Sequence, residues 1–228
     1  MNQHQIKAHI ENKLKENKFV YITIEGNIGA GKTRFLTKIQ DKIEFAKKNQ
    51  TCLVLQEPVE IWEKTNLLKM YYLDPKKNAL NFQLTAFCTT LLTLKNSLKT
   101  AFSSPSPIVI FGERSPLACV KCFTPLLIEQ GKINPQNEYY IEFRKIFEEI
   151  LPYIYPDVIF YLNDSNTTTL LKRIKKRNRP GEENITLDYL QHLEKKYDQM
   201  MNEISQKKTT IIIHENNEKL IDEIIDLF

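Results

Sequence analysis

The residues with the clearest chemical potential form the run Gly26-Asn-Ile-Gly-Ala-Gly-Lys-Thr33, which follows the β-branched segment Phe19–Glu25. The spacing G-x-x-x-x-G-K-T between a strand and a helix is typical of a loop that binds the phosphates of a nucleoside triphosphate. Its glycines let backbone N–H groups turn toward an anion. Lys32 would reach the β- and γ-phosphates, and the Thr33 hydroxyl is placed to hold Mg²⁺. We expect ATP to contact the whole loop: Gly26, Asn27, Ile28, Gly29, Ala30, Gly31, Lys32 and Thr33.

Two further strands are predicted to end in residues that could act on a substrate beside the phosphates. The apolar run Cys52–Gln56 is followed by Glu57, and the run Ile108–Phe111 leads into Glu113-Arg114-Ser115. The carboxyl ends of parallel strands meet at one edge of a sheet, where a bound ligand also lies. Glu57 would therefore emerge on the reactive side, where a base is useful.

Arginines form the third chemical group. Arg173 and Arg177 lie four residues apart on one face of a predicted helix, and Arg179 follows just beyond its end. Guanidinium groups can clamp transferring phosphoryl oxygens and stabilise the charge of the transition state. A kinase must also exclude water, for which a mobile basic lid is a common device. We interpret residues 173–184 as an arginine-rich lid, with a solvated cationic surface as the alternative.

Strand and helix patterns alternate along the chain and would position these groups. Strands are predicted at 19–25, 52–56, 108–111, 157–162 and 209–213. Helices are predicted after the phosphate loop and at 61–73, 77–102, 116–130, 136–150, 167–177, 187–204 and 220–228. The first eighteen residues are expected to form a short amphipathic helix or a frayed end. The pattern predicts an α/β fold: a five-stranded parallel sheet with helices on both faces, in a single domain over residues 1–228.

Composition excludes several classes of protein. The net charge is only +4 for 228 residues, which gives no support for a nucleic-acid partner. No apolar run approaches the length of a membrane span, and no targeting segment is visible, so a cytoplasmic protein is expected. Cys119-x-x-Cys122 lacks a second Cys or His pair to complete a zinc site, which favours two cysteines on a helix.

A phosphate loop alone does not separate a GTPase, an ATP-driven motor and a small-molecule kinase. The guanine-binding N-K-x-D motif is absent, because Asn163-Asp164 lacks the lysine. Motor ATPases usually end a strand in Asp or Asp-Glu, whereas here the strand ends in Glu113-Arg114-Ser115. Together with the lid, these differences favour a kinase that phosphorylates a small alcohol.

At this point the chain resembles the deoxyribonucleoside kinases, the family that includes deoxycytidine kinase, mitochondrial thymidine kinase and the insect enzyme of broad specificity. The resemblance runs from about residue 19 to residue 204 and implies the three-layer P-loop kinase fold. Five blocks carry it, in order: Glu25 to Thr33, Glu57-Pro-Val59 with Trp62, Tyr72 with Phe82-Gln83, Glu113-Arg-Ser115, and the lid ending at Tyr189.

The resemblance implies the reacting groups. Glu57 would accept the proton of the sugar 5′-hydroxyl as that oxygen attacks the γ-phosphate, unless it only caps the turn at Pro58. Arg114 would orient the 5′-oxygen, and Glu113 would help Thr33 to hold Mg²⁺. A structural ion pair is the alternative for Arg114 and Glu113.

The resemblance also implies the groups that bind the nucleoside. Gln83 would pair with the base, since an amide offers a donor and an acceptor together, although it could be an exposed helix residue. Tyr72 and Glu182 would bind the 3′-hydroxyl, and Glu183 is an alternative to Glu182. Three aromatic residues would form the walls around the base, with ordinary core packing as the alternative: Trp62, Phe82 and Phe123.

Departures from the family pattern concern specificity. Where deoxycytidine kinase has Arg and Asp facing the base, this chain has the uncharged Thr90 and Cys119, and Tyr71 stands where relatives often carry Met. These differences favour an ATP-dependent deoxynucleoside 5′-kinase for pyrimidines, thymidine first and deoxycytidine second. The resemblance further implies a homodimer built on helices 77–102 and 116–130. Thymidylate kinase and a non-catalytic kinase-like subunit are the alternatives.

Overall fold

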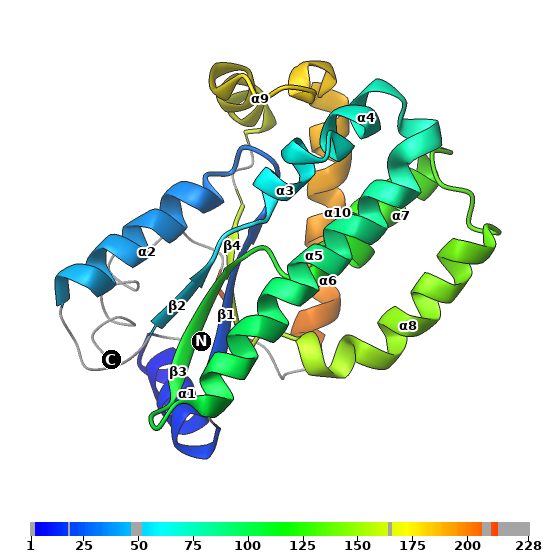
Figure 1. Ribbon diagram of the computed structural model, residues 1–228. Coiled ribbons are helices and arrows are strands. Elements are labelled where there is room, and N and C mark those ends of the chain that lie inside the picture. The colour runs from blue at the N-terminus through cyan, green and yellow to red at the C-terminus, as the bar shows by residue number, and fades with distance from the viewer. Residues whose placement is uncertain (1–2, 18, 47–51, 164–165, 207–210, 214–228) are drawn as a thin grey trace.

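A parallel β-sheet runs through the centre of the computed structural model, which describes residues 3–17, 19–46, 52–163, 166–206 and 211–213 (Figure 1). Hydrogen bonding orders its strands β2-β3-β1-β4-β5, and every neighbouring pair is parallel. This order agrees with the five-stranded parallel sheet expected from the sequence. The strands have these bounds: β1 (Phe19–Gly26), β2 (Cys52–Leu55), β3 (Ile108–Glu113), β4 (Val158–Leu162) and β5 (Ile211–Ile213).

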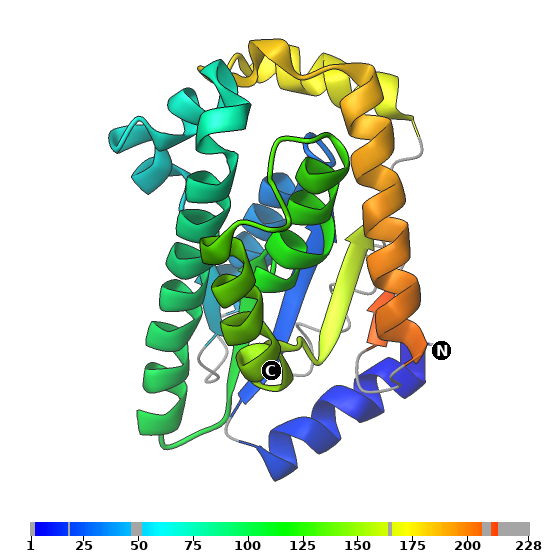
Figure 2. The same cartoon turned by 90° about the vertical axis from the view of Figure 1, so that its right-hand side faces the viewer.

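Alternating side chains divide the interior into two cores, one on each face of the sheet. On β1, Val20, Ile22 and Ile24 pack into one core, whereas Tyr21 packs into the other. Helices α1 (Gln3–Glu16) and α2 (Lys32–Ala46) close the first core. Figure 2 shows α7 between α5 and α10 on the opposite side. That face is covered by α5 (Pro75–Ser103), α6 (Pro116–Ala118), the π-helix η1 (Cys119–Phe123), α7 (Thr124–Glu129), α8 (Glu138–Ile154) and α10 (Leu187–Gln206).

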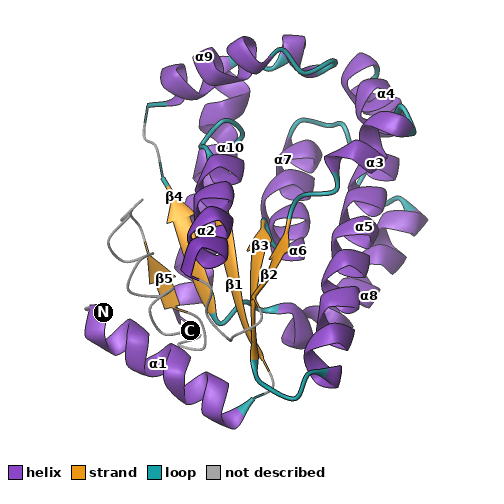
Figure 3. Ribbon diagram, turned by 60° about the vertical axis from the view of Figure 1, so that its left-hand side comes forward, coloured by secondary structure: helices purple, strands orange, loops and turns teal. Residues whose placement is uncertain are grey.

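The carboxyl ends of the strands meet at one edge of the sheet. The register pairs Ile24 of β1 with Glu113 of β3, and Gly26 of β1 with Leu162 of β4. The phosphate loop therefore starts beside the end of β3, as expected for a parallel sheet. Figure 3 shows the strand arrows pointing toward this end of the molecule. Four short elements lie there: α3 (Val59–Lys64), α4 (Leu67–Leu73), α9 (Thr167–Arg177) and the 3₁₀ turn η2 (Glu182–Asn184).

The helix predicted over 61–73 is wrong as a single element. The structure divides it into α3 and α4 at Asn66, whose φ of 57° lies in the left-handed region that Asn tolerates better than most residues. Helix α5 begins at Pro75, earlier than predicted, because the Asp74 side chain accepts a hydrogen bond from the Lys77 N–H at 3.2 Å. The predicted helix 220–228 lies outside the described residues.

The segment 116–130 is helical as predicted, but its central turn differs from an α-helix. Its central turn, η1, is π-helical, and the Thr124 N–H donates to the Cys119 carbonyl to close it. Most of the segment is buried against α5 and α10, and Glu129 is its one exposed residue. The expectation that it contributes to a surface for a second subunit stays a prediction. Separately, none of the described helices is both long and apolar enough to cross a membrane.

Candidate active site

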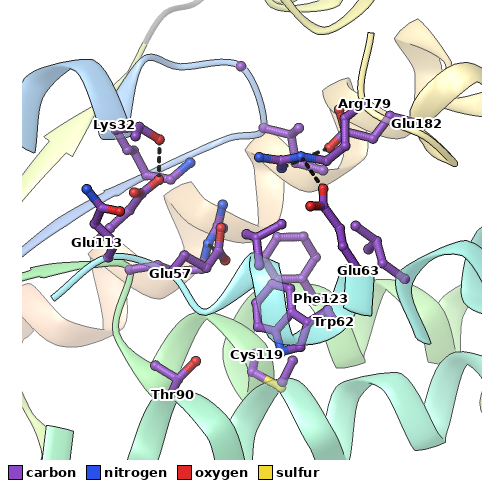
Figure 4. A pocket seen from close by; sticks show the side chains of 18 of the residues that line it. Lys32, Glu57, Trp62, Glu63, Thr90, Glu113, Cys119, Phe123, Arg179 and Glu182 are labelled. Carbon is purple, nitrogen blue, oxygen red and sulfur yellow. Dashed lines mark hydrogen bonds and ion pairs between the residues drawn. The ribbon is translucent and has the colours of Figure 1, made fainter. Parts of the chain in front are cut away.

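A cavity of about 570 Å³ opens at the carboxyl edge of the sheet, between the phosphate loop, helices α3 to α5 and the lid. Its volume falls within the range of sites for small molecules. Figure 4 shows the loop residues and the lid residues on different sides of it. Most of the predicted site residues line this cavity: Ile28, Gly29, Gly31, Lys32, Thr33, Glu57, Trp62, Tyr72, Phe82, Gln83, Glu113, Arg114, Phe123, Arg173, Arg177, Arg179 and Glu182.

The phosphate loop is held between the lid and α10. Gly29 has a φ of 81°, and a Cβ there would lie 2.8 Å from the Leu170 carbonyl oxygen of α9, so only glycine allows this approach. The Asn27 side chain donates to the Leu190 carbonyl at 2.8 Å, away from the cavity. Gly26, Asn27 and Ala30 do not line the cavity, so the structure brings only part of the predicted loop to it.

Lys32 lies under the loop and is 5% exposed. Its Nζ donates to the Gly26 and Asn27 carbonyl oxygens at 3.1 and 2.9 Å. Burial and, to a smaller extent, repulsion from Arg114 lower the pKa of Lys32 to about 7, although the carboxylates of Glu57 and Glu113 oppose this shift. A triphosphate bound in the loop would supply the negative charge that this ammonium group lacks.

Thr33 and Glu113 place two oxygen ligands beside the loop. The Thr33 hydroxyl donates to Glu113 Oε1 at 2.8 Å, and Glu113 is buried. A hydroxyl and a carboxylate fit Mg²⁺, which prefers oxygen and usually takes one or two protein ligands together with substrate phosphates and water. Within the part of the chain that the structure describes, no group of three or more His, Cys, Asp or Glu residues could hold a metal alone.

The backbone at the end of β3 aims Arg114 into the cavity. Arg114 has a φ of 63°, an uncommon value for a residue other than glycine. Two hydrogen bonds hold it there: the Arg114 N–H donates to the Ile24 carbonyl at 3.0 Å, and the Ser115 N–H donates to Glu25 Oε1 at 2.6 Å. Burial raises the pKa of the Glu25 carboxyl, although Arg114 opposes the shift.

The Arg114 side chain joins Glu57 to helix α10. Its Nε donates to Glu57 Oε1 at 2.9 Å, and its Nη1 donates to the Tyr197 hydroxyl. Its guanidinium carbon lies 4.8 Å from the centre of the Phe123 ring. Burial alone would lower the pKa of Arg114, but Tyr197 and Glu57 raise it above its ordinary value, so the group stays charged. Glu57 is therefore held in the cavity beside a permanent positive charge.

Aromatic residues and an amide form the other end of the cavity. The rings of Trp62 and Phe82 meet edge to face at 5.5 Å, and those of Tyr71 and Phe82 stack at 4.8 Å. Gln83 is buried, and Cys119 Sγ lies 3.2 Å from its side-chain oxygen. Such aromatic rings can stack on a base while the amide hydrogen-bonds to the edge of the base.

The lid carries an acid, Glu182, that two of its arginines hold. Arg177 donates two hydrogen bonds to its carboxylate, at 2.8 and 2.7 Å, and Arg179 lies 3.4 Å from it. Figure 4 shows Arg179 also facing Glu63 of α3, at 3.3 Å. Arg173 instead donates to the Gly29 carbonyl of the phosphate loop at 3.3 Å. Glu182 is buried and lines the cavity.

The alternative acid in the lid is Glu183, which is exposed and does not line the cavity. Both acids lie in the 3₁₀ turn that follows Gly181, whose φ of 93° turns the chain there. The geometry therefore favours Glu182 over Glu183 as a ligand for a bound molecule.

Comparison with known proteins agrees with this geometry. A family model described as deoxynucleoside kinase matches residues 22–226. The chain belongs to the deoxynucleoside kinase family. It is 31% identical over 197 residues to a probable deoxycytidine kinase of Fowlpox virus, which covers 86% of this chain and 77% of that protein. It is also 27% identical over 179 residues to a deoxyguanosine kinase of Bacillus subtilis, covering 78% of this chain and 76% of that one.

Membership of the family makes this protein a nucleoside kinase that uses ATP as its phosphate donor. The names of similar proteins differ in the nucleoside. Besides the deoxycytidine and deoxyguanosine kinases, a thymidine kinase of Ictalurid herpesvirus 1 is 24% identical over 207 residues, covering 90% of this chain and 83% of that protein. The base preference of this deoxynucleoside kinase must therefore be argued from its own cavity.

Sequence reasoning missed three residues that shape the site of this kinase. Tyr197 binds Arg114, Glu25 holds the backbone after Arg114, and Glu63 pairs with a lid arginine. Glu25 stands directly before the phosphate loop in the sequence, so a buried acid there could have been noticed. Tyr197 belongs to the apolar face of α10, and Glu63 to the polar face of α3, so neither had a signal in the sequence.

Proposed function

We propose that this deoxynucleoside kinase transfers the γ-phosphoryl group of ATP to the 5′-hydroxyl of deoxyribonucleosides. Pyrimidines are its preferred substrates, thymidine first and deoxycytidine second, and its role is nucleotide salvage. The observation that carries the proposal is the position of the Glu57–Arg114 pair, which shares one cavity with Lys32 on one side and Gln83 on the other. The proposal treats residues 1–228 as a single domain whose lid spans about 173–184.

Glu57 supplies the base. Its carboxylate accepts the proton of the 5′-hydroxyl while that oxygen forms a bond to the γ-phosphorus, and the bond from this phosphorus to the β,γ-bridging oxygen breaks to release ADP. The Arg114 guanidinium holds Glu57 through the 2.9 Å contact and offers its remaining N–H groups to the 5′-oxygen. Lys32 and the lid arginines at 173, 177 and 179 stabilise charge on the transferring group.

Thr33 and Glu113 are the residues that would hold Mg²⁺ in this proposal. Their mutual contact of 2.8 Å shows that a hydroxyl and a carboxylate reach the same point beside the loop. The bound ion would neutralise charge on the phosphates. Removal of the ion by a chelator should then abolish turnover while leaving nucleoside binding at the Gln83 end of the cavity intact.

The uncharged base end of the cavity supports the pyrimidine preference. Gln83 can make two hydrogen bonds to a pyrimidine edge. Thr90 and Cys119 line the same region and carry no charge at neutral pH, since burial raises the pKa of the Cys119 thiol to about 12. Trp62, Phe82 and Phe123 are the proposed aromatic walls around the base.

The sugar end of the cavity supports a preference for deoxyribose. Tyr72 and Glu182 are the proposed ligands of the 3′-hydroxyl, and both line the cavity. Gly181 lies directly over Tyr72, where a Cβ would come within 2.9 Å of the ring, so this tyrosine is held in place under the lid. A ring fixed there leaves little room for a 2′-hydroxyl.

A homodimer built on helices 77–102 and 116–130 is also part of the proposal, and apolar side chains on α5, which includes 77–102, and on the neighbouring α8 support it. Helices α5 and α8 carry exposed apolar side chains, which are uncommon on a protein surface when they occur together. They are Leu92, Phe102, Tyr139, Ile141, Ile146 and Tyr153. Sedimentation of the wild type and of Ile146→Glu tests this, and a monomer in both would contradict it. A cytoplasmic location remains a prediction from the sequence.

A phosphorylation panel tests the proposed function. Purified enzyme with ATP and Mg²⁺ is given each of the four natural deoxynucleosides, their ribose counterparts and thymidine monophosphate. We expect the highest kcat/KM with thymidine, then deoxycytidine, and weak turnover of ribonucleosides. Turnover of thymidine monophosphate alone would favour a thymidylate kinase. Nucleoside binding without turnover of any substrate would favour a non-catalytic kinase-like subunit.

A further inference from the structure

Cys119 and Gln83 meet at the base end of the cavity. Cys119 Sγ lies 3.2 Å from Gln83 Oε1 and 3.2 Å from the Gln83 backbone oxygen. The thiol has one proton to donate, and the backbone oxygen belongs to helix α5, where it accepts a helical hydrogen bond. The side-chain oxygen is therefore the acceptor with capacity to spare. Both side chains are less than a tenth exposed, so water does not compete freely for this contact.

Cys119, which faces Gln83, is the first residue of the π-helical turn η1. Its Cys119 carbonyl accepts from the Thr124 N–H, five residues on, which adds one residue to the turn. Cys119 and Phe123 line the cavity, whereas Cys122 faces the core and lies 3.6 Å from Met200 Sδ. The turn thus separates two cysteines of the same sequence motif. Figure 4 shows Cys119 among the side chains that line the pocket.

The protonation state of Cys119 decides the direction of the hydrogen bond. Burial raises the pKa of its thiol to about 12, so the thiol keeps its proton at neutral pH and acts as a donor. Because the thiol donates, it favours the orientation of the Gln83 amide in which the oxygen, and not the NH₂ group, faces Cys119. In the described residues, no hydrogen bond engages the Gln83 Nε2, so its two N–H groups remain for a ligand.

We propose that Cys119 is a positioning residue for Gln83: its thiol holds Gln83 Oε1 against the protein, so that the amide NH₂ is presented to an acceptor on the base. Thymine offers O4 and cytosine offers N3 as that acceptor. The second lone pair of Gln83 Oε1 then accepts the neighbouring N–H of the base. This inference rests on the proposed function, because it assumes that a nucleobase occupies this end of the cavity.

A double-mutant cycle tests the inference. Cys119→Ala removes the donor and lets the Gln83 amide rotate so that its NH₂ group and its oxygen exchange places. The KM for thymidine should then rise about fivefold to tenfold, with kcat changed less than about twofold. Cys119→Ser keeps a donor and should restore KM to within about twofold of the wild type. In a Gln83→Ala background, Cys119→Ala should change KM by less than about twofold, since no amide remains to orient.

Cys122→Ala is the matched control. It removes a buried thiol from the same turn, so it should lower stability without changing KM. Equal effects of Cys119→Ala in both backgrounds, or failure of serine to rescue, would overturn the role of Cys119. The cycle is run with whichever deoxynucleoside the wild type phosphorylates best. Purine-only turnover would therefore refute the proposed pyrimidine preference, while the coupling between Cys119 and Gln83 is still measured.

Discussion

Replacing Glu57 by Gln removes a charge from the cavity while keeping the size and shape of the side chain. Glu57 Oε1 accepts from Arg114 Nε at 2.9 Å, and a glutamine oxygen can accept the same hydrogen bond. The substitution should therefore leave Arg114 in place, because Tyr197 also binds it. What glutamine cannot do is accept the proton of the 5′-hydroxyl.

The expected loss follows from the role of a general base. Such a group contributes roughly 10²-fold to 10⁴-fold to the rate, so kcat should fall by at least about 10²-fold, equivalent to about 2.7 kcal/mol in the activation free energy. The affinity for thymidine should change less than about threefold, because the nucleoside contacts remain. Stability should fall by no more than about 1 kcal/mol, because the ion pair becomes a neutral hydrogen bond in a partly solvated site.

The assay combines kcat from continuous detection of ADP with the dissociation constant of thymidine from calorimetry. Glu60→Gln is the matched control, because Glu60 lies on α3, three residues after Glu57, is exposed, and pairs with Lys64 at 3.5 Å. Its kcat should stay within about twofold of the wild type. A Glu57→Gln enzyme with unchanged kcat would refute Glu57 as the base, and so would a loss of kcat no larger than the loss of binding.

Three further predictions concern the lid and the base pocket. Gly181→Ala should cost more stability in urea than Gly131→Ala, by about 1 kcal/mol or more, because both glycines have positive φ but only a Cβ at 181 meets another group, the Tyr72 ring at 2.9 Å. Equal losses would contradict this packing. Glu182→Gln should raise KM for thymidine about tenfold but leave that for 3′-deoxythymidine nearly unchanged, and equal increases would remove Glu182 as the ligand of the 3′-hydroxyl. Burial raises the pKa of Cys119 from 9.0 to about 12, so the folded state keeps a proton that the unfolded chain releases, and stability should fall between pH 9 and 12. This fall should be steeper in the wild type than in Cys119→Ser, by up to about 1.4 kcal/mol per pH unit, and parallel curves would contradict it.

The sequence predicted the elements whose pattern is local. Buried strands such as 157–162 are continuous apolar runs, and α9 has the predicted bounds because Asn166 and Asn178 stand at its two ends. The break at Asn66 was missed, because apolar residues continue on both sides of it. Its left-handed backbone is set by the packing of α3 and α4, which the sequence does not reveal.

The candidate site was predicted where a motif fixes the backbone. The phosphate loop and the residues after β2 and β3 share one edge of the sheet, so their meeting follows from the topology. Pairings between distant elements could not be predicted, because they depend on how helices pack. Tyr197 is 83 residues from its partner Arg114, and Glu63 meets Arg179 across the cavity.

Helix η1 is the clearest case of a feature hidden from the sequence. The run from Cys119 to Phe123 has an ordinary helical pattern, and the prediction that both cysteines lie on a helix is confirmed. The turn contacts both α5 and α10. Within it, Cys119 lines the cavity, whereas Cys122 is fully buried.

The central claim is that one cavity holds the sugar alcohol of a deoxynucleoside between Glu57 and a triphosphate bound at Lys32. Its most direct test is the binding of thymidine joined through its 5′-oxygen to adenosine by a chain of phosphates. This account predicts that the compound binds more tightly than thymidine or ATP and competes with both. Competition with only one of the two substrates would contradict it.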